Sequence, residues 1–301
     1  MTLVTRTISL RPGKSQAGPR LGAPRVAPAK RQWSVLVWFS YFWIGLIVLL
    51  AVLAPVLPIA PYDAVVAAPR QAPQAGTLDA LLGTDQVGRS ILSRLIYGGQ
   101  VSLVVGTVSA LAGVVIGTTL GLVAGFFRKG ADWVITLVAD VLLSFPALVL
   151  LLALTAIFSP SVPTLLIGLA VASTPTFIRL ARANTMSWSS REFVRAARNM
   201  GAPDSRILFR EILPNVVPTI AAYMPLVIAA LIVAEGSLSF LGLGIPPPTP
   251  SWGGMINSGA AELRSHPYMV FVPATVLFLT VFALNQAGEH LRLRFDRTMQ
   301  D

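Results

Sequence analysis

The chain has 301 residues, of which 54% are hydrophobic and only 12% are charged, and its formal net charge is +10. Soluble domains carry about 25% charged residues, so this composition excludes a water-exposed globule and indicates an integral membrane protein. The chain has no cysteine, which excludes disulfides, thiolate metal sites and cysteine nucleophiles. Two histidines are too few for a histidine metal centre, so we expect no metal site. Because the apolar runs are long, we assign the positive charge to membrane topology and expect no nucleic-acid partner.

Residues 1–32 form a basic segment rich in Gly, Pro and Ala, with seven Lys and Arg and no Asp or Glu. This composition predicts a disordered cytoplasmic tail. The apolar run that follows, residues 33–61, is too long for the hydrophobic part of a signal peptide and lacks a clear cleavage site. It is long enough to cross the hydrocarbon core, so we predict the first transmembrane helix there.

Residues 62–100 are predicted to form an extracytoplasmic segment with an interfacial helix. Residues 101–291 are predicted to form a core of five further spans, and residues 292–301 a cytoplasmic tail. The spans are expected to be helices, because lipid offers the backbone no other hydrogen-bond partner. They are predicted at Val101–Phe127, Trp133–Ile157, Thr164–Ile178, Val216–Ala234 and Tyr268–Ala287.

The basic residues set the orientation. With the N-terminus inside, 19 of the 23 Lys and Arg residues fall in predicted cytoplasmic segments. Every inner loop then agrees with the positive-inside rule. The sequence therefore predicts an all-α membrane protein with six transmembrane helices and both termini in the cytoplasm.

The second span carries a glycine at every fourth position, at Gly113, Gly117, Gly121 and Gly125. Such a stripe makes one helix face smooth and lets another helix approach closely. We interpret the stripe as packing only.

The longest cytoplasmic loop, residues 184–215, carries two predicted short helices. Gly201 is a typical helix stop, Pro203 a typical restart, and Pro214 is expected to end the second helix. Ala196 and Ala197 give the first helix a low profile. The second helix is expected to expose an apolar patch, formed by Ile207, Leu208, Ile212 and Leu213.

Two interpretations of this loop are open. Apolar residues between arginines are typical of a helix that docks into the groove of a protein partner. An amphipathic helix that lies on anionic lipid has the same pattern. Physical chemistry gives the two equal weight.

Ionisable residues near the spans are few, and such residues often mark function. Asp132 is placed at a helix N-terminus, which favours an anion. Asp140 lies about two turns further on, where it either lines a transport path or makes a structural hydrogen bond between helices. Glu235 is expected either to face the translocation cavity or to reach the membrane interface.

The outer loop, residues 236–267, is rich in Gly and Pro yet strongly apolar. Irregular backbone at membrane depth must be buried in protein, so we expect a folded segment there. One interpretation is a scoop that closes the outer mouth, and the other is a packed cap without a gating role. The residues assigned to this outer gate are Glu235, Ser237, Phe240, Leu241, Gly242, Gly244 and Trp252.

Four stretches together resemble one family. The loop pattern from Glu192 through Gly201 to Pro214 is similar to the EAA loop of ABC importer permeases. The segments Leu82–Ser102, Asp140–Pro146 and Ser237–Gly253 resemble other parts of peptide permeases, in the same order. The similarity runs from about Trp33 to Arg297 and is greatest to the C-type subunits of dipeptide and oligopeptide importers, the DppC/OppC group.

The resemblance implies the type I importer permease fold in the inner or plasma membrane. It also implies a heterodimer with a B-type permease subunit, two ATPase subunits that bind ATP and Mg²⁺, an extracytoplasmic substrate-binding protein and a peptide substrate. No cofactor and no catalysis are expected in this chain. The residues implied to couple to the ATPases are Glu192, Ala196, Ala197, Gly201, Ile207, Leu208, Glu211 and Pro214.

Two features depart from the family pattern: the long basic tail, and Glu211, where the family usually has histidine. Gly13-Lys14-Ser15 is no phosphate-binding loop, because the glycine required five positions earlier is Ile8. Nickel or haem is the alternative cargo. A secondary transporter is disfavoured because no inverted repeat is visible. An intramembrane serine protease using Ser237 or Ser239 is disfavoured because His290 lies at the opposite membrane face.

Overall fold

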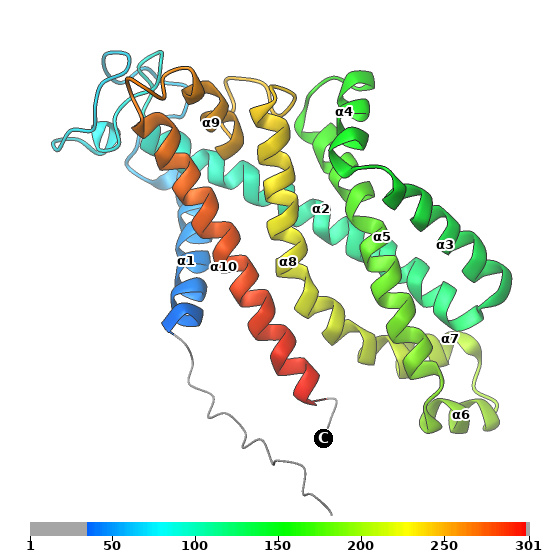
Figure 1. The fold of residues 1–301 in the computed structure, drawn as a ribbon. Helices are drawn as coiled ribbons and strands as arrows, with labels where there is room; N and C mark the ends of the chain where they lie inside the picture. The colour runs from blue at the N-terminus through cyan, green and yellow to red at the C-terminus, as the bar shows by residue number, and fades with distance from the viewer. Residues whose placement is uncertain (1–34, 299–301) are drawn as a thin grey trace, which may run out of the picture. The chain divides into compact units, whose positions relative to one another are not determined.

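The computed structural model describes residues 35–298. The predicted basic tail, residues 1–32, lies outside the described residues. Between residues 35 and 298 the regular elements are helical, apart from two isolated β-bridges. Helices α1 to α10 are Val35–Leu53, Ile91–Phe127, Lys129–Ser144, Ala147–Ile157, Val162–Ser189, Glu192–Asn199, Asp204–Arg206, Leu213–Phe240, Trp252–Ala260 and Tyr268–Thr298 (Figure 1).

Five helical segments are long and apolar enough to cross a membrane, and a bent pair, α3 with α4, supplies the sixth span if both halves cross together. This agrees with the predicted all-α membrane fold. Two short 3-10 turns, Ala54–Val56 and Leu78–Ala80, and a π-turn at Ile207–Ile212 complete the described helical elements.

Helix α2 begins at Ile91, ten residues before the predicted span. Ser90 caps its first turn by accepting a hydrogen bond from the Ser93 backbone N–H at 3.2 Å. At 37 residues the helix is about 55 Å long, well beyond the hydrocarbon thickness of about 30 Å. Its first turns were therefore missed by a prediction based on apolar length alone.

The predicted third span, Trp133–Ile157, is not one straight helix. It breaks between α3 and α4, whose axes differ by 86°. Pro146 lies at the break, and a residue before proline is pushed out of the α region. Phe145 accordingly has φ −88° and ψ 129°, in the extended region.

Helix α5 does not end at Ile178 as predicted. It passes through Pro175 and continues to Ser189. Spanning helices tolerate proline where neighbouring helices cover the exposed backbone, and Pro175 is buried. Arg179 and Arg182 consequently lie on a helix and not in the cytoplasmic loop.

Helices α2 and α5 pack backbone against backbone along the predicted glycine stripe. All four glycines of the stripe are buried. A Cβ atom on Gly121 would lie 2.6 Å from the Ala181 Cβ and 2.6 Å from the Ile178 carbonyl oxygen. A Cβ on Gly117 would meet Phe177 equally closely. The packing interpretation of the stripe is confirmed.

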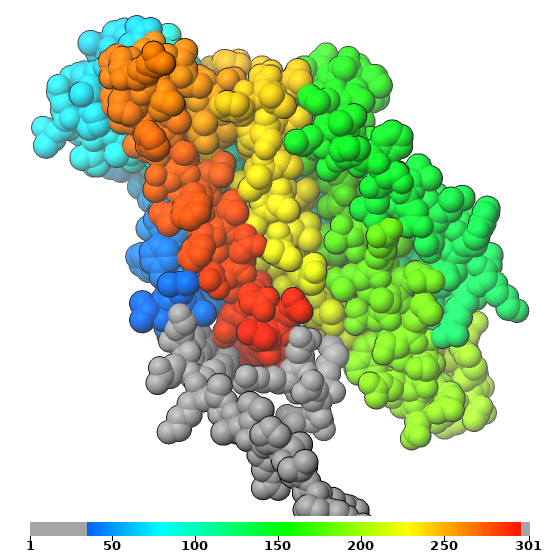
Figure 2. Space-filling model, in the orientation of Figure 1, coloured from blue at the N-terminus to red at the C-terminus, as the bar shows by residue number. Residues whose placement is uncertain are grey.

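Helix α10 lies between α1 and α8 on the face that Figure 2 shows. Trp43 on α1 donates its indole N–H to the Thr280 hydroxyl at 3.1 Å. Tyr41 on α1 and His290 on α10 share a hydrogen bond of 3.0 Å, which is a second polar contact between these two helices. Only 11% of the apolar window of α1 is buried, as expected for a helix that faces lipid.

Gly121→Val tests the α2–α5 contact. The added side chain would force the two helices apart, and overpacking of this kind costs about 1–3 kcal/mol. We expect the purified variant to unfold at a temperature several degrees lower in detergent. Gly45→Val on α1 is the matched control, because no atom lies within 4 Å of a Cβ there. Equal melting temperatures for the two variants would contradict the close-packing interpretation.

Candidate functional site

The predicted stop at Gly201 is present as a complete helix C-cap. Gly201 has φ +78°, a conformation that glycine adopts without strain. Its N–H bonds to the Arg198 carbonyl at 3.0 Å, and the Ala202 N–H bonds to the Ala197 carbonyl at 3.1 Å. These two bonds are the Schellman pattern, which satisfies the last carbonyls of α6 and reverses the chain.

The second half of the loop differs from the prediction. The chain restarts at Asp204 as expected, but Pro214 does not end a helix. It lies in the first turn of α8, where a missing N–H costs little, and the π-turn at Ile207–Ile212 precedes it. Asp204 to Phe240 is thus one helical segment of 37 residues.

The apolar patch expected on the loop surface is not exposed. Ile207, Leu208 and Ile212 are buried in the main hydrophobic core, together with Val194 and Ala197 of α6. The exposed apolar side chains are instead Met200, 81% exposed, and Phe209, 63% exposed, followed by Phe193. The sequence pattern alone did not distinguish the two faces, because the π-turn shifts the register of the second helix.

The other residues predicted for this surface differ in exposure. Glu192, Ala196 and Pro214 are exposed, and Glu211 is half-buried. Glu211 makes no ion pair with any described residue. Five arginines of the loop are exposed as well: Arg191, Arg195, Arg198, Arg206 and Arg210. Two of them are held over aromatic rings at 5.3 Å, Arg191 over Trp188 and Arg198 over Phe126. The surface therefore combines cations with protruding apolar side chains.

At the other end of α8, Glu235 is fully buried, so both predicted positions for it are wrong. Its carboxylate accepts hydrogen bonds from the Ser239 hydroxyl at 2.6 Å and the Ser102 hydroxyl at 3.0 Å. The Ser251 hydroxyl donates to Ser239 at 3.3 Å. The backbone N–H of Trp252 donates to the Ser102 hydroxyl at 3.3 Å. One carboxylate thus joins α2, α8 and the start of α9.

Trp252 is the apolar anchor of this network. Its side chain is completely buried, and its indole N–H donates to the Leu95 carbonyl of α2 at 3.0 Å. The ring packs so closely on Gly99 of α2 that a Cβ atom there would lie only 2.9 Å from it. The outer loop is thus folded and fastened to the core, as the prediction of a buried irregular segment required.

The other residues assigned to the outer gate lie at the end of α8. Ser237 and Phe240 belong to the helix itself, and the exposed Leu241 follows it. Gly242 has φ +77°, and Gly244 packs directly against Ser239. Three of them, Ser237, Phe240 and Leu241, line an apolar cavity of about 350 Å³. Its other lining residues are Val233, Gly236, Gly253, Ile256 and Leu277.

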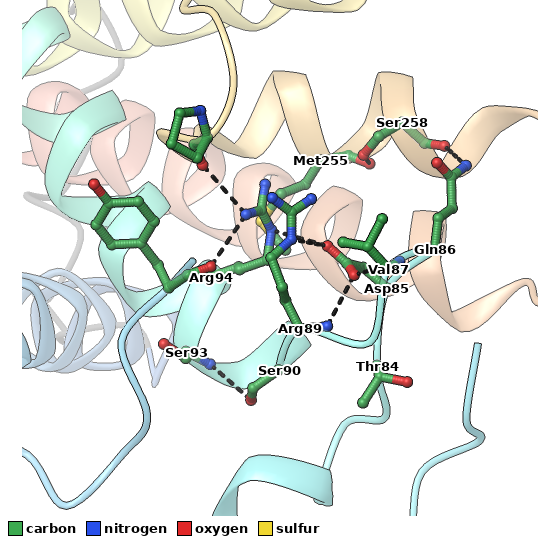
Figure 3. A network of polar contacts seen from close by, with 12 residues as sticks. Thr84, Asp85, Gln86, Val87, Arg89, Ser90, Ser93, Arg94, Met255 and Ser258 are labelled. Atoms are coloured by element: carbon green, nitrogen blue, oxygen red, sulfur yellow. Dashed lines mark hydrogen bonds and ion pairs between the residues drawn. The ribbon is translucent and has the colours of Figure 1, made fainter. Parts of the chain in front are cut away.

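A polar hub is formed by Asp85 and Arg89, before α2, and by Arg94 in the first turn of α2; the sequence predicted no role for it (Figure 3). Asp85 accepts hydrogen bonds from the backbone N–H groups of Val87 and Arg89, each at 2.9 Å, and from Arg89 Nε at 2.7 Å. Arg94 Nε lies 3.5 Å from the same carboxylate. The guanidinium of Arg94 also donates to the carbonyls of Tyr62 and Pro248.

The hub therefore ties the segment before α2 to the outer loop. The available signal was the run Gly-Thr-Asp-Gln-Val-Gly, residues 83–88, which is rich in turn formers and contains a carboxylate able to close the turn. What could not be seen in sequence is the partner from the outer loop, which lies over 150 residues away.

A second contact joins the same two segments at their surface. Arg70 Nε donates to Glu262 at 2.8 Å. This hydrogen bond lowers the pKa of the Glu262 carboxyl below its ordinary value. Since a lowered pKa favours the ionised form, the contact is kept at neutral pH and is lost only as the pH falls through that lowered pKa.

Asp132 and Asp140 connect α3 to α5. The Arg179 guanidinium donates a hydrogen bond to the Asp140 carboxylate at 2.7 Å. The structure therefore contains the hydrogen bond between helices that was one of the two predictions for Asp140. Asp132 receives two bonds from Arg182, one of them at 2.8 Å. Asp132 is therefore held by an arginine as well as by its place at the start of the helix.

Comparisons with known proteins agree with this geometry. Residues 117–297 match the family described as binding-protein-dependent transport system inner membrane component. The glutathione transport system permease protein GsiD of Pectobacterium atrosepticum is 41% identical over 215 residues, 71% of each chain. The dipeptide transport system permease protein DppC of Alkalihalophilus pseudofirmus is 35% identical over 253 residues, 84% of this chain and 83% of that one.

The fold is also similar to a solved structure, the MetNI methionine ABC transporter in an inward-facing conformation. The TM-score is 0.56 at 19% identity, and the match covers 67% of this chain and 96% of the other. The helical fold and these matches define the class as a membrane-embedded permease subunit of an ABC importer, a transport component and not an enzyme. The chain belongs to the family of binding-protein-dependent transport system inner membrane components.

Glu235→Leu tests the buried carboxylate network. It removes the acceptor of two serine hydroxyls and leaves them unsatisfied in the core, which costs about 1–3 kcal/mol for each. We expect faster proteolysis of the outer loop, residues 241–251, in the purified chain. Glu235→Gln keeps one acceptor oxygen and should lie between wild type and Glu235→Leu. Identical cleavage rates for all three proteins would show that the carboxylate does not hold the loop.

Proposed function

We propose that this permease imports peptides, as half of a translocation path completed by a B-type permease subunit. Two ATPase subunits that bind ATP and Mg²⁺ would drive it, and an extracytoplasmic binding protein would deliver the cargo. Support comes from relatives whose names specify glutathione and dipeptide transport, at 41% and 35% identity.

We further propose that the loop from Glu192 to Pro214 is the surface that docks on an ATPase. The observation that carries this assignment is the exposure of Met200 and Phe209 among five exposed arginines. We call α6, the Gly201 cap and the turn up to Pro214 the elbow. Large apolar side chains exposed on short helices of this kind are typical of a helix that fills a groove in a protein partner. Glu211, without an ion pair among the described residues, offers a charge for the same contact.

The structure offers a mechanical route for coupling. Because α7, the π-turn and α8 form one continuous segment of 37 residues, a displacement of the elbow moves α8 along its whole length. At its far end α8 carries Glu235, which is bonded to α2 and to the outer loop. ATP-driven closure of the ATPase pair would thus reach the outer gate residues as a rigid-body movement.

The competing functions receive no such support. Ser239 donates its hydroxyl to Glu235 and Ser237 donates to the Val233 carbonyl at 2.8 Å, and neither contacts a histidine among the described residues. A serine nucleophile needs a base within hydrogen-bond reach. Nickel and haem remain the alternative cargoes, and a transport assay separates them from peptides.

The function is tested by reconstitution of the chain with its permease partner, ATPases and binding protein in proteoliposomes. Peptides of two to five residues, glutathione, haem and nickel are each supplied, and cargo-stimulated ATP hydrolysis and uptake are measured. The proposal expects stimulation by peptides. Stimulation by haem or nickel alone would overturn the peptide assignment, and uptake without ATPase subunits would overturn the ATP-driven mechanism.

Gly201→Val tests the elbow. A β-branched residue is strained at φ +78°, so the cap should open and α6 should lose its orientation. We expect less ATPase to co-purify with the variant, while its amount in the membrane stays normal. Normal co-purification together with normal import would refute the elbow assignment.

The matched control is Gly242→Val on the outer side. Gly242 has φ +77°, and neither glycine has an atom within 4 Å of a Cβ position. The backbone cost is thus nearly the same, but the ATPase contact is far away. Gly242→Val should keep its ATPase subunits, and loss of ATPase from both variants would indicate general misfolding.

Glu211→Lys tests the charge of the docking surface. If Glu211 faces a basic group of the ATPase, reversal replaces attraction by repulsion. Assembly should then weaken by about 1 kcal/mol or more at low salt, with a smaller effect at high salt because ions screen the charge. The measurement is ATPase co-purification at two salt concentrations. Unchanged assembly at both would remove any role for this charge.

A further inference from the structure

Two stacked ion pairs join α3 to α5, and they differ in exposure. In the pair Asp132–Arg182 the side chains are 20% and 31% exposed. In the pair Asp140–Arg179, one turn further from the cytoplasmic loop along α5, they are 51% and 58% exposed. The second pair is thus held by a single hydrogen bond of 2.7 Å and is open on one side.

The position of the open pair restricts what it faces. Arg179 lies ten residues before the end of α5, about 15 Å along the helix axis. Asp140 lies deep in α3, eleven residues after its start. Ionisable side chains in spanning segments face a bundle interior or a water-filled cavity, because lipid contact is costly. A half-exposed pair at this place therefore points to an aqueous path.

A cavity lies along the face of α5 that carries Arg179. It measures about 310 Å³ and lies between α4, α5 and α8. Ala172, Ser173 and Thr176 line it from α5, and Arg179 follows Thr176 by three residues, so it continues the same helix face. Most of the remaining lining is apolar, with Tyr223 as the aromatic member. The cavity thus has a mainly apolar lining, and the Asp140–Arg179 pair lies about one turn beyond its Thr176 end along α5.

We propose that Asp140 and Arg179 form a transit site for the charged ends of a zwitterionic peptide. Arg179 takes the carboxylate, for which a guanidinium offers two parallel donors, and Asp140 takes the ammonium group. The cavity further along α5 takes an apolar side chain. This inference rests on the proposed peptide cargo and extends it to named residues of this chain.

The arrangement fits a site that must release what it binds. In the absence of cargo the two charges neutralise each other, so neither is left unpaired. When cargo arrives, each group exchanges one charged partner for another, and the net cost of desolvation is small. The more enclosed pair Asp132–Arg182 meanwhile keeps α3 attached to α5, so opening of the outer pair need not separate the helices.

The first test measures whether water-soluble reagents reach the proposed site. Because the chain has no cysteine, a single introduced cysteine is its only thiol. Arg179→Cys and Thr176→Cys are made separately in the reconstituted importer and exposed to a charged methanethiosulfonate reagent. Both should react, because thiols ionise in water, and peptide supplied during turnover should slow the reaction. Ile167→Cys is the control, because Ile167 is exposed on the opposite side of α5 and should face lipid.

Transport gives the second test. Uptake of a free peptide is compared with uptake of its C-terminal amide at saturating concentrations of loaded binding protein, so that delivery does not limit the rate. Arg179→Gln should reduce the preference for the free carboxylate about tenfold, as loss of one charge-assisted hydrogen bond predicts. Arg182→Gln is the matched control and should keep the preference, although it can lower stability.

The outcomes separate this inference from the proposed function. If the unmodified importer takes up no peptide, the proposed cargo is wrong. If it does, but Arg179→Cys and Thr176→Cys both resist the reagent in every state, a partner subunit or lipid covers the site and the inference is overturned. Reaction without protection by peptide, together with an unchanged carboxylate preference in Arg179→Gln, would overturn it equally.

Discussion

The close approach of α2 and α5 is the constraint on which the rest of the structure depends. Glycines on α2 bring the backbone of one helix against the side chains and carbonyls of the other, with room for no further Cβ. In lipid the association of helices relies on such contact, because lipid tails are as apolar as the side chains they replace. The two helices thereby form one closely packed unit. Helix α5 in turn positions three other features. It carries the arginines that pair with α3, it lines the cavity between α4, α5 and α8, and it leads directly into α6.

The same packing explains on which side of α5 its arginines lie. Its α2-facing side is filled by packing, so Arg179 and Arg182 project from the remaining surface toward α3. There each arginine has a carboxylate available at the correct height, Asp140 and Asp132. An arginine on the packed side would be an unpaired charge in the core, at a cost of several kcal/mol.

The sequence predicted the membrane class, the glycine stripe and the Gly201 stop, because each depends on local composition or spacing. Its six spans agree with the structure if the bent pair α3 and α4 counts as one span. Proline was less informative. Pro146 breaks the chain by 86°, whereas Pro175 and Pro214 lie inside continuous helical segments. Whether a proline breaks a helix depends on neighbours that satisfy or cover the freed backbone. Those neighbours are set by tertiary packing, so the residue alone does not decide the outcome.

Burial was the second property that local sequence did not reveal. Glu235 lies in an apolar helix, where the sequence predicted contact with a cavity or with the membrane interface. It is instead buried, and its partner Ser102 comes from a helix more than 130 residues away. The two ends of α8 are therefore built in opposite ways. At the elbow, apolar and cationic side chains are exposed and offer a contact surface. At the outer end, a buried carboxylate binds α8 to α2 and to the outer loop. A force applied at the exposed end is thus transmitted to a joint that hydrogen bonds hold, and the outer loop must follow α8 unless those bonds break.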